Sequence, residues 1–338
     1  VQNVTDIDDP LLDRAQETGV GWKDLAQSQT DLYRSDMEAL SVIPPTHFVG
    51  VVESMHLVVE GVQQMLEAGA AYWVGPDLYA DLSADNRFGS IGKFDRATQL
   101  EFFSERGGDP DTPGKRDPLD PLLWRGKRDA EPAWDGGVLG WGRPGWHIEC
   151  AIIARRYLDV PFVLQGGGED LVFPHHEMSL SHLRILTDTD HPAEVNMHAA
   201  LLAYKGEKMS KSLGNLVFVS GLRELGVEPD VIRLLLLDQH YRHEWEYTQD
   251  KLSHAQQRFA RWQDAMATDS NGSGPTGEQV LETVRGHLAN DLDTASALKA
   301  VDQWAESGRK TTADRRLVAD LTDGLFGVKK LTALIAAS

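Results

Sequence analysis

The spacing of apolar residues along the chain predicts two helical stretches near the amino terminus. Apolar positions recur at helical intervals over residues 10–40 and again over 51–68. The proline pair Pro44-Pro45 terminates the first stretch, and Gly69 ends the second. We therefore expect amphipathic helices that each bury one face.

The pattern of apolar and polar residues changes twice in the middle of the chain. From about 72 to 138, short strand patterns lie between loops rich in Gly, Pro and Asp, which indicates a small inserted α/β subdomain. Alternation of helix and strand returns from Pro144, with 146–158 helical and 161–168 a strand entering a glycine turn. This alternation predicts a Rossmann-like parallel sheet in an α/β nucleotide-binding domain, with the site at the carboxyl edge of the strands.

The carboxyl-terminal third is helical from about residue 228 onward. The stretch DSNGSGPTG at 269–277 interrupts it and has the composition of a flexible linker. We predict an incomplete catalytic domain over 1–220, a connecting stem over 221–250 and a helical bundle over 251–338.

Composition narrows the class of protein without identifying it. A chain of 338 residues has room for about two domains. The single cysteine excludes an internal disulfide and fits a reducing compartment, and no apolar run is long enough to span a bilayer. The net charge of −19 weakens the case for a nucleic-acid partner, because polyanions usually bind basic surfaces. We expect a cytoplasmic protein that binds neither nucleic acid nor membrane.

The most specific motif is GEKMSKSLGN, which places Lys208, Ser210, Lys211 and Ser212 within five residues. A mobile loop with two lysines and two hydroxyls can wrap an ATP triphosphate and neutralise the charge on departing pyrophosphate. The alternative is a solvated basic turn, but the full string is far rarer by chance than a single KxxK pattern. It predicts adenylate-forming chemistry.

A candidate metal site is formed by Cys150 and His175, which lie 25 positions apart on either side of a triple-glycine turn. Thiolate and imidazole are the ligands that zinc prefers. A lone cysteine is more often a small buried hydrophobe, and a histidine pair opening a helix more often caps or packs, so both alternatives stay open. Two ligands do not complete a site, so we expect at least one more from elsewhere.

Further candidates surround this pair. The glycine turn ending at Gly168 allows the backbone to approach a ribose or phosphate, and the following Asp170 could hold an ammonium group. Trp146 precedes Cys150 by one helical turn and could wall a small pocket. The alternatives are a plain tight turn and an ordinary core tryptophan.

Two other segments carry weaker signals. Thr5 offers a hydroxyl beside several carboxylates, although such a run is usually a solvated loop or a helix cap. The turn ERGGDP presents Glu105, Arg106 and Asp109, which suit a polyhydroxylated ligand such as an amino sugar. A surface turn is the default reading of that segment.

These residues converge on one family. The chain resembles class I aminoacyl-tRNA synthetases, in particular the cysteinyl-tRNA synthetases, and still more the related cysteine ligases of mycothiol biosynthesis. Those ligases join cysteine to the amine of glucosaminyl-inositol at the expense of ATP. The resemblance covers residues 1–250 strongly, and its motifs are NVTDIDD, DPLDPLLW, GRPGWHIEC, GGGEDLVFPHHE, GEKMSKSLGN and LLLLDQHYR.

Four features favour the ligases over the synthetases. Ser179 stands where the synthetases carry a zinc-binding glutamate, and Gln165 stands where they usually have histidine. ERGGDP at 105–110 resembles a segment of the ligases, and the chain stops after one helical bundle. A cysteinyl-tRNA synthetase, possibly truncated, remains the alternative, and a non-catalytic synthetase-like binding protein is a third hypothesis.

The resemblance implies one zinc ion held by Cys150, His175 and a cysteine in a preceding segment, with substrate thiolate in an open position. Zinc then selects cysteine over serine, because it binds a soft thiolate far better than a hydroxyl. The same carry-over implies that Thr5 and Trp146 line the cysteine pocket and that Asp170 meets the amino group. Contacts to cysteinyl adenylate are implied for Asn3, Val4, Gly168, Glu169, Leu202 and, near the nucleotide end, His198.

The implied reaction has two steps and uses Mg-ATP. Cysteine is first activated as the adenylate while Lys208 and Lys211 stabilise pyrophosphate, and the sugar amine then attacks the activated carbonyl. An HxGH-type motif is expected in the segment preceding residue 1, so we predict that residues 1–338 alone are inactive. The expected form is a monomer.

Overall fold

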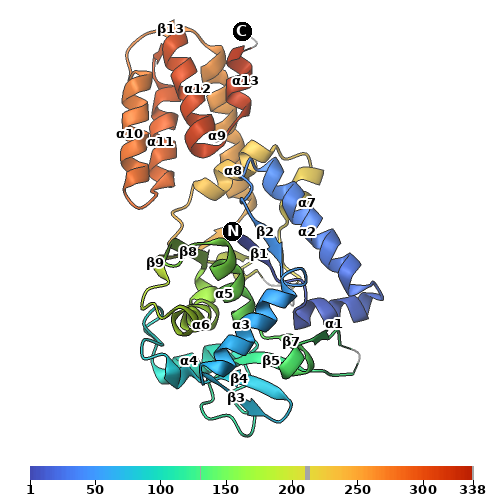
Figure 1. Ribbon diagram of the computed structural model, residues 1–338. Coiled ribbons are helices and arrows are strands. Elements are labelled where there is room, and N and C mark those ends of the chain that lie inside the picture. The colour runs from blue at the N-terminus through green and yellow to red at the C-terminus, as the bar shows by residue number, and fades with distance from the viewer. Residues whose placement is uncertain (130, 210–213, 337–338) are drawn as a thin grey trace. The chain divides into compact units, whose positions relative to one another are not determined.

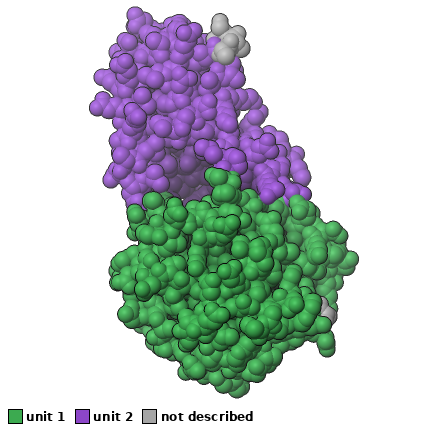
Figure 2. Space-filling view, viewed as in Figure 1, with its two compact units in different colours: residues 1–30, 45–198 green, residues 31–44, 199–338 purple. Residues whose placement is uncertain are grey.

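The computed structural model describes residues 1–129, 131–209 and 214–336, which fold into two compact units (Figure 2). The first unit comprises Val1–Thr30 and Pro45–His198, and the second comprises Asp31–Pro44 and Ala199–Ser338. Within the described ranges, none of the helices combines the length and apolar character that crossing a bilayer requires. The division at 220 and 250 stays a prediction, since the compact units interleave along the chain.

The first unit alternates helices with short strands (Figure 1). Its helices, of which α2 continues into the second unit, are α1 (Asp9–Thr18), α2 (Trp22–Ala39), α3 (Met55–Glu67), α4 (Arg96–Glu105), α5 (Trp146–Tyr157) and α6 (Glu177–Thr187). Its strands are β1 (Gln2–Val4), β2 (Phe48–Gly50), β3 (Ala71–Val74), β4 (Asp77–Ala80), β5 (Leu122–Gly126), β6 (Trp134–Asp135), β7 (Trp141–Pro144), β8 (Phe162–Gly168) and β9 (Ala193–Ala199).

The insertion and the rest of this unit differ in their type of sheet. Strand β1 pairs in parallel with β2, and β8 lies beside β9. The insertion instead forms an antiparallel sheet in the order β3-β4-β5-β7-β6, which continues to Pro144. The parallel pairing and the alternation of elements confirm the predicted α/β class, and the insertion brings the chain directly to the start of α5.

Helix α3 shows how the apolar spacing produces the core of the first unit. Val58, Val62 and Met65 lie on one face of the helix and are fully buried. Gly61 lies on the same face, where a Cβ atom would come within 2.2 Å of Ile152 Cδ1 in α5. Only glycine therefore allows α3 and α5 to pack this closely, and the packing fixes α5 as the helix that presents the site.

The second unit is mainly helical. Its helices are α7 (Val219–Glu224), α8 (Pro229–Leu237), α9 (Gln249–Ala267), α10 (Gly277–Ala289), α11 (Thr294–Glu306), α12 (Thr312–Phe326) and α13 (Lys330–Ala336). Its strands are β10 (Leu202–Tyr204), β11 (Glu207–Lys208), β12 (Trp245–Tyr247), β13 (Ser270–Asn271) and β14 (Arg309–Lys310). The helices from α9 to α13 form the predicted bundle around the buried Trp262 and Trp304 (Figure 1).

The prediction of a flexible linker at 269–277 is wrong. Strand β13 pairs with β14, and the Gly272 N–H donates to the Gly308 carbonyl at 2.8 Å. A Cβ atom on Gly272 would lie 2.6 Å from that carbonyl oxygen, so the glycine permits a close backbone approach. Thr276 then closes the segment with a capping box at the start of α10. The glycine-rich composition reflects tight pairing here.

Candidate active site

The thiol of Cys150 lies where α5 meets β1. Gly145 precedes the helix, and a Cβ atom there would come within 1.9 Å of the Leu122 carbonyl oxygen, so glycine is required to start α5 against β5. The Asn3 side-chain amide donates to Cys150 Sγ at 3.0 Å. The structure therefore brings together two residues that are 147 positions apart, both of which were predicted to serve the site.

The imidazole of His175 is held from two sides. His175 belongs to the kinked segment Val172–His176, in which Phe173 is extended, immediately before α6. Its ring stacks on Trp146 with centroids 4.1 Å apart and planes 19° apart, and its Nδ1 lies 3.0 Å from His147 Nδ1. Trp146 retains 37% exposure, so it forms a wall rather than an ordinary core residue.

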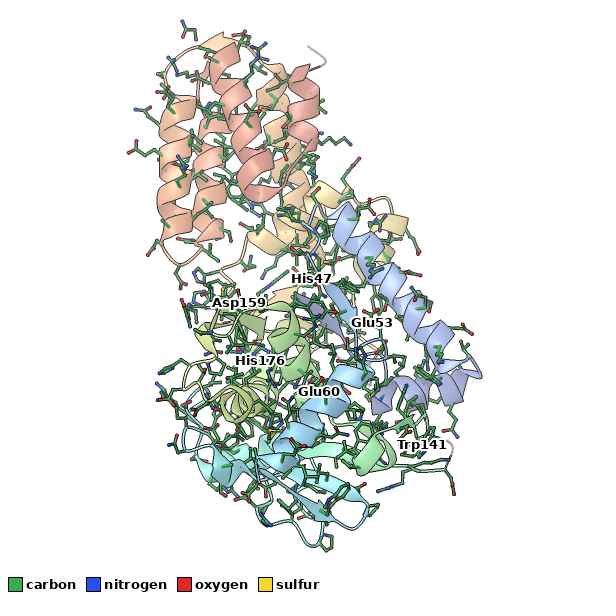
Figure 3. All side chains as sticks on the ribbon, viewed as in Figure 1. His47, Glu53, Glu60, Trp141, Asp159 and His176 are labelled. Atoms are coloured by element: carbon green, nitrogen blue, oxygen red, sulfur yellow. The ribbon has the colours of Figure 1, made fainter. Side chains whose placement is uncertain are left out.

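A second imidazole pair extends this cluster. His176 (Figure 3) places Nδ1 at 2.8 Å from Nε2 of His198, at the end of β9. Burial lowers the pKa of His176 to about 4 and that of His147 to about 3, and neighbouring histidines add to the effect. At neutral pH these rings are uncharged, and each can donate at one nitrogen and accept at the other.

Burial also keeps the Cys150 thiol protonated in the metal-free protein. Desolvation raises the pKa of Cys150, and the neighbouring Glu149 carboxylate raises it further. The side chain of Glu149 is itself buried, which raises its pKa well above the usual range. A cation at this position would favour the thiolate, because metal binding displaces the thiol proton.

Two of the three glycines that end β8 are packed against the protein's own side chains. A Cβ atom on Gly167 would lie 2.7 Å from the His176 ring, and one on Gly168 would lie 2.6 Å from Asp170 Oδ1. Close approach to His176 and Asp170 thus explains these two glycines, whereas Gly166 faces open space with only Leu164 at 3.8 Å. Adenylate contacts by Gly168 and Glu169 stay predictions.

Arg106 braces this turn from the insertion. Its guanidinium donates to the carbonyls of Asp170 at 2.7 Å and Phe173 at 2.5 Å, and it lies over the Phe102 ring at 4.2 Å. Both carbonyls belong to the short segment that connects Gly168 to His175. The structure therefore gives Arg106 a role in positioning the site, and an amino-sugar contact stays a prediction.

The other two residues of the ERGGDP segment differ in their surroundings. Asp109 accepts from Tyr79, from Thr112 at 2.9 Å and from the buried Lys115 at 3.0 Å. Glu105 is exposed at the end of α4. Asp109 is thus bonded within the insertion, which leaves its predicted sugar contact without a structural observation in support.

The predicted phosphate-binding residues lie in the second unit. Lys208 ends strand β11, which pairs antiparallel with β10, and Leu202 begins β10. Ser210, Lys211 and Ser212 lie outside the described residues. The roles of these five residues stay predictions.

Among the described residues, Cys150 and His175 are the predicted metal ligands. No group of three or more His, Cys, Asp or Glu side chains there could hold an ion. Ser179 Oγ donates to the His147 carbonyl at 3.0 Å, and Glu177 accepts from the N–H groups of Ile91 and Gly92. Neither side chain supplies a third ligand. Zinc binding by Cys150 and His175 stays a prediction, which rests on the preference of zinc for thiolate and imidazole.

The sequence analysis missed the residues that orient these donors. His147 faces His175, and its signal was its place between Trp146 and Cys150 on the same helix. Glu177 ties residues 91–92 of the insertion to α6, and nothing in a single sequence indicated that contact.

Comparisons with known proteins place this chain in a family. The family described as tRNA synthetases class I (C) catalytic domain matches residues 1–257. A Beutenbergia cavernae protein named L-cysteine:1D-myo-inositol 2-amino-2-deoxy-alpha-D-glucopyranoside ligase is 54% identical, over 97% of this chain and 80% of its own length. A Streptomyces coelicolor protein of the same name is 50% identical over the same shares.

A solved structure agrees on the fold. Mycobacterium tuberculosis methionyl-tRNA synthetase bound by methionyl-adenylate superposes with a TM-score of 0.64 at 16% identity, covering 98% of this chain and 84% of that one. The fold and the relatives thus confirm the resemblance seen in the sequence motifs. The chain belongs to the class I aminoacyl-tRNA synthetase family, within its branch of L-cysteine:1D-myo-inositol 2-amino-2-deoxy-alpha-D-glucopyranoside ligases.

Proposed function

We propose that the protein activates L-cysteine with ATP and transfers the cysteinyl group to the amine of glucosaminyl-inositol. The observation that carries this proposal is the 54% identity, over 97% of the chain, to a relative named for that reaction. The site supports it, because Trp146, one helical turn before Cys150 on α5, stacks on the His175 imidazole. The substrates are small molecules, and the expected cytoplasmic monomer stays a prediction.

Cysteine selection is assigned to the first unit. Cys150 and His175 would hold zinc together with a ligand from outside the described residues, and zinc when bound supplies a soft cation that prefers thiolate to hydroxyl. When His175 donates from Nδ1 to His147, its Nε2 lone pair is left for the metal. Trp146 fixes the ring plane, Thr5 lines the pocket, and Asp170 receives the substrate ammonium group.

Adenylation is assigned to the KMSKS residues. The cysteine carboxylate attacks the α-phosphorus of Mg-ATP, and the bond from that phosphorus to the bridging oxygen breaks, releasing pyrophosphate. Lys208 and Lys211 neutralise the charge that accumulates on this leaving group, and Ser210 and Ser212 donate to its oxygens. Asn3, Val4, Gly168, Glu169, Leu202 and His198 would hold the adenylate in place.

Amide formation follows from the activated carbonyl. The unprotonated sugar amine attacks the carbonyl carbon, and the carbon–oxygen bond to AMP breaks. Glu105, Arg106 and Asp109 are candidates to recognise the amino sugar. The contacts of Arg106 to the turn before His175 also allow it to act through that turn.

The test uses the full-length protein with ATP, cysteine and either glucosaminyl-inositol or tRNA. We expect one AMP and one pyrophosphate for each cysteinyl amide identified by mass, and no product when serine replaces cysteine. The matched family also contains tRNA synthetases, so cysteinyl transfer only to tRNA would replace the proposal with that second function.

A further inference from the structure

The hairpin that carries Lys208 is built on a tight turn in the second unit. Strands β10 and β11 pair Tyr204 with Glu207 and Ala203 with Lys208. Between them, Lys205 and Gly206 both have positive φ angles, of 57° and 77°. Two successive positive φ angles are typical of a type I′ turn, whose twist matches that of the flanking strands. The direction in which the chain leaves Lys208 therefore depends on this turn.

Met209 and Asn215 both contact strand β10. The Met209 N–H points to the Leu202 carbonyl at 3.4 Å, and the Asn215 side-chain amide points to the Tyr204 carbonyl at 3.4 Å. Whatever holds β10 and its turn in place therefore also holds Met209 and Asn215.

A carboxylate on the neighbouring strand contacts the turn directly. Strand β12 pairs in parallel with β10, with Leu202 opposite Trp245 and Tyr204 opposite Tyr247. Between these two pairs, Glu246 Oε1 accepts a hydrogen bond from the Gly206 N–H at 2.8 Å. An ionised acceptor makes this a charge-assisted bond, which is stronger than a neutral one. It links β12 to the bend that delivers Lys208.

The far end of this arrangement is anchored to the helical bundle of the same unit. Tyr241 accepts at its carbonyl from the Ala200 N–H at 2.7 Å and donates from its hydroxyl to Asp291 at 2.7 Å. Arg242 pairs with the same carboxylate through Nε at 2.5 Å. These bonds hold the start of the segment that becomes β12, so Glu246 acts from a fixed strand.

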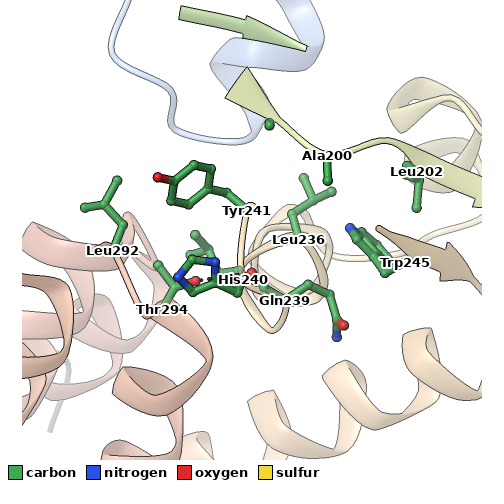
Figure 4. Close-up of a pocket in the computed structure, with 11 residues that line it drawn as sticks. Ala200, Leu202, Leu236, Gln239, His240, Tyr241, Trp245, Leu292 and Thr294 are labelled. Carbon is green, nitrogen blue, oxygen red and sulfur yellow. Dashed lines mark hydrogen bonds between the residues drawn. The ribbon is translucent and has the colours of Figure 1, made fainter. Parts of the chain in front are cut away.

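A cavity lies next to these strands. Its volume is about 380 Å³, and its lining includes Leu202 of β10, Trp245 of β12 and Leu292 of the bundle (Figure 4). Leu202, Tyr204 and Trp245 also pack against the hydrophobic core of the second unit. Apolar packing thus holds the strands, and Glu246 adds a polar contact at the turn itself.

We propose that Glu246 is a positioning residue for the adenylation step, acting through Gly206 on Lys208. This inference rests on the proposed function, since it assigns the effect to the half-reaction that releases pyrophosphate. Loss of one such hydrogen bond from a site that must align with ATP corresponds to a loss of about tenfold in rate or affinity. Amide formation from adenylate already made does not require the leaving-group lysines.

The experiment compares Glu246→Ala, Glu246→Gln and Glu244→Ala in the full-length protein. Glutamine retains an acceptor oxygen for Gly206, and Glu244 is an exposed carboxylate just before β12, which makes Glu244→Ala the matched control. Cysteine-dependent exchange of pyrophosphate into ATP reports the first half-reaction. Mixing prepared cysteinyl adenylate with glucosaminyl-inositol reports the second.

We expect Glu246→Ala to raise the KM for ATP or lower the exchange rate by about tenfold while leaving the second half-reaction unchanged. Glu246→Gln and Glu244→Ala should remain within about twofold of wild type in both assays. Wild-type exchange rates in Glu246→Ala, or equal losses in both half-reactions, would overturn the positioning role. Absence of cysteine-dependent exchange in wild type would instead overturn the proposed function, and the positioning role with it.

Discussion

The two units hold their candidate site residues in opposite ways. In the first unit, His175 is buried and Cys150 is half-buried, and each contacts a neighbouring side chain, Asn3 or His147. In the second unit, Lys208 lies at the end of a two-residue strand that is fixed by backbone pairing and one carboxylate contact. A group that selects a thiol benefits from fixed geometry and exclusion of water, whereas groups that follow a departing phosphate need access to it.

This contrast predicts that substitutions in the first unit act through metal and substrate recognition, and substitutions in the second act through phosphate chemistry. The largest effect is expected for Cys150→Ala. Loss of a ligand should remove zinc and reduce cysteine-dependent pyrophosphate exchange by at least about 10³-fold, more than the 10–100-fold typical of losing a ligand's hydrogen-bond partner. Metal analysis of the purified protein, combined with the exchange assay, measures both.

Ser179→Ala is the matched control for that variant. Ser179 donates to a backbone carbonyl, so its loss should leave the zinc content unchanged. A full zinc content in Cys150→Ala would contradict the metal assignment. The first unit could then no longer be assigned the role of selecting cysteine through zinc.

The second prediction concerns acid stability of the metal-depleted protein. Burial lowers the pKa of His147 and His182 to about 3 and of His176 to about 4 in the folded state, against about 6.5 unfolded. Protonation therefore favours the unfolded chain, so the stability is fully present above pH 6.5 and is lost as pH falls toward 4. At pH 5.5, each histidine lowers the free energy of unfolding by about 1 kcal/mol relative to its value at neutral pH.

All three histidines belong to the first unit, so the loss should be local. Hydrogen exchange at pH 7.5 and 5.5, corrected for intrinsic rates, should show greater loss of protection in α5 and α6 than in α9 and α11. Equal loss in both units would show that the buried imidazoles do not control acid stability.

The third prediction tests the phosphate side of the contrast. Lys208→Ala should lower the exchange rate by about 10²-fold, because one donor to the developing charge is removed. Zinc content and amide formation from prepared adenylate should stay at wild-type values. Loss of zinc in Lys208→Ala would show that metal binding and phosphate chemistry are not assigned to separate units as proposed.

The smallest effect is expected for Arg106→Ala. Loss of the bonds to the carbonyls of Asp170 and Phe173 should destabilise the first unit by about 1–3 kcal/mol and raise the KM for cysteine. The exposed Glu105→Ala serves as control and should show neither change. If Arg106 binds the amino sugar instead, the KM for glucosaminyl-inositol will rise while cysteine-dependent exchange is unaffected.

Periodicity was sufficient to predict the helices that bury an apolar face recurring every three to four residues, such as α3 and the bundle helices around Trp262. It did not predict α4, which buries only Phe103 and lies in the stretch predicted as short strands and loops. Glycine-rich segments were ambiguous, since glycine occurs both in flexible linkers and where two backbones approach closely. Gly272 allows a close backbone approach, and only its partner strand, almost 40 residues later, reveals this.

The candidate site was predicted as a set of residue types, and its internal contacts were not. The KMSKS string and the Cys150–His175 pair carry chemistry that is visible in one dimension. The bond from His147 to His175 and the bonds from Arg106 to the turn before it arise from tertiary packing. Those contacts cannot be predicted from a single sequence.

The interleaving of the two units constrains how the chain is made. Residues 31–44 belong to the second unit, where Asp36 pairs with Arg223 and the Leu40 carbonyl accepts from Arg233. At a synthesis rate of about 5–20 residues per second, these early residues wait roughly ten to forty seconds for their partners to emerge from the ribosome. A fragment beginning at residue 199 would lack them altogether. The second unit is therefore the last to close during synthesis, and it cannot be separated from the first by a single cut.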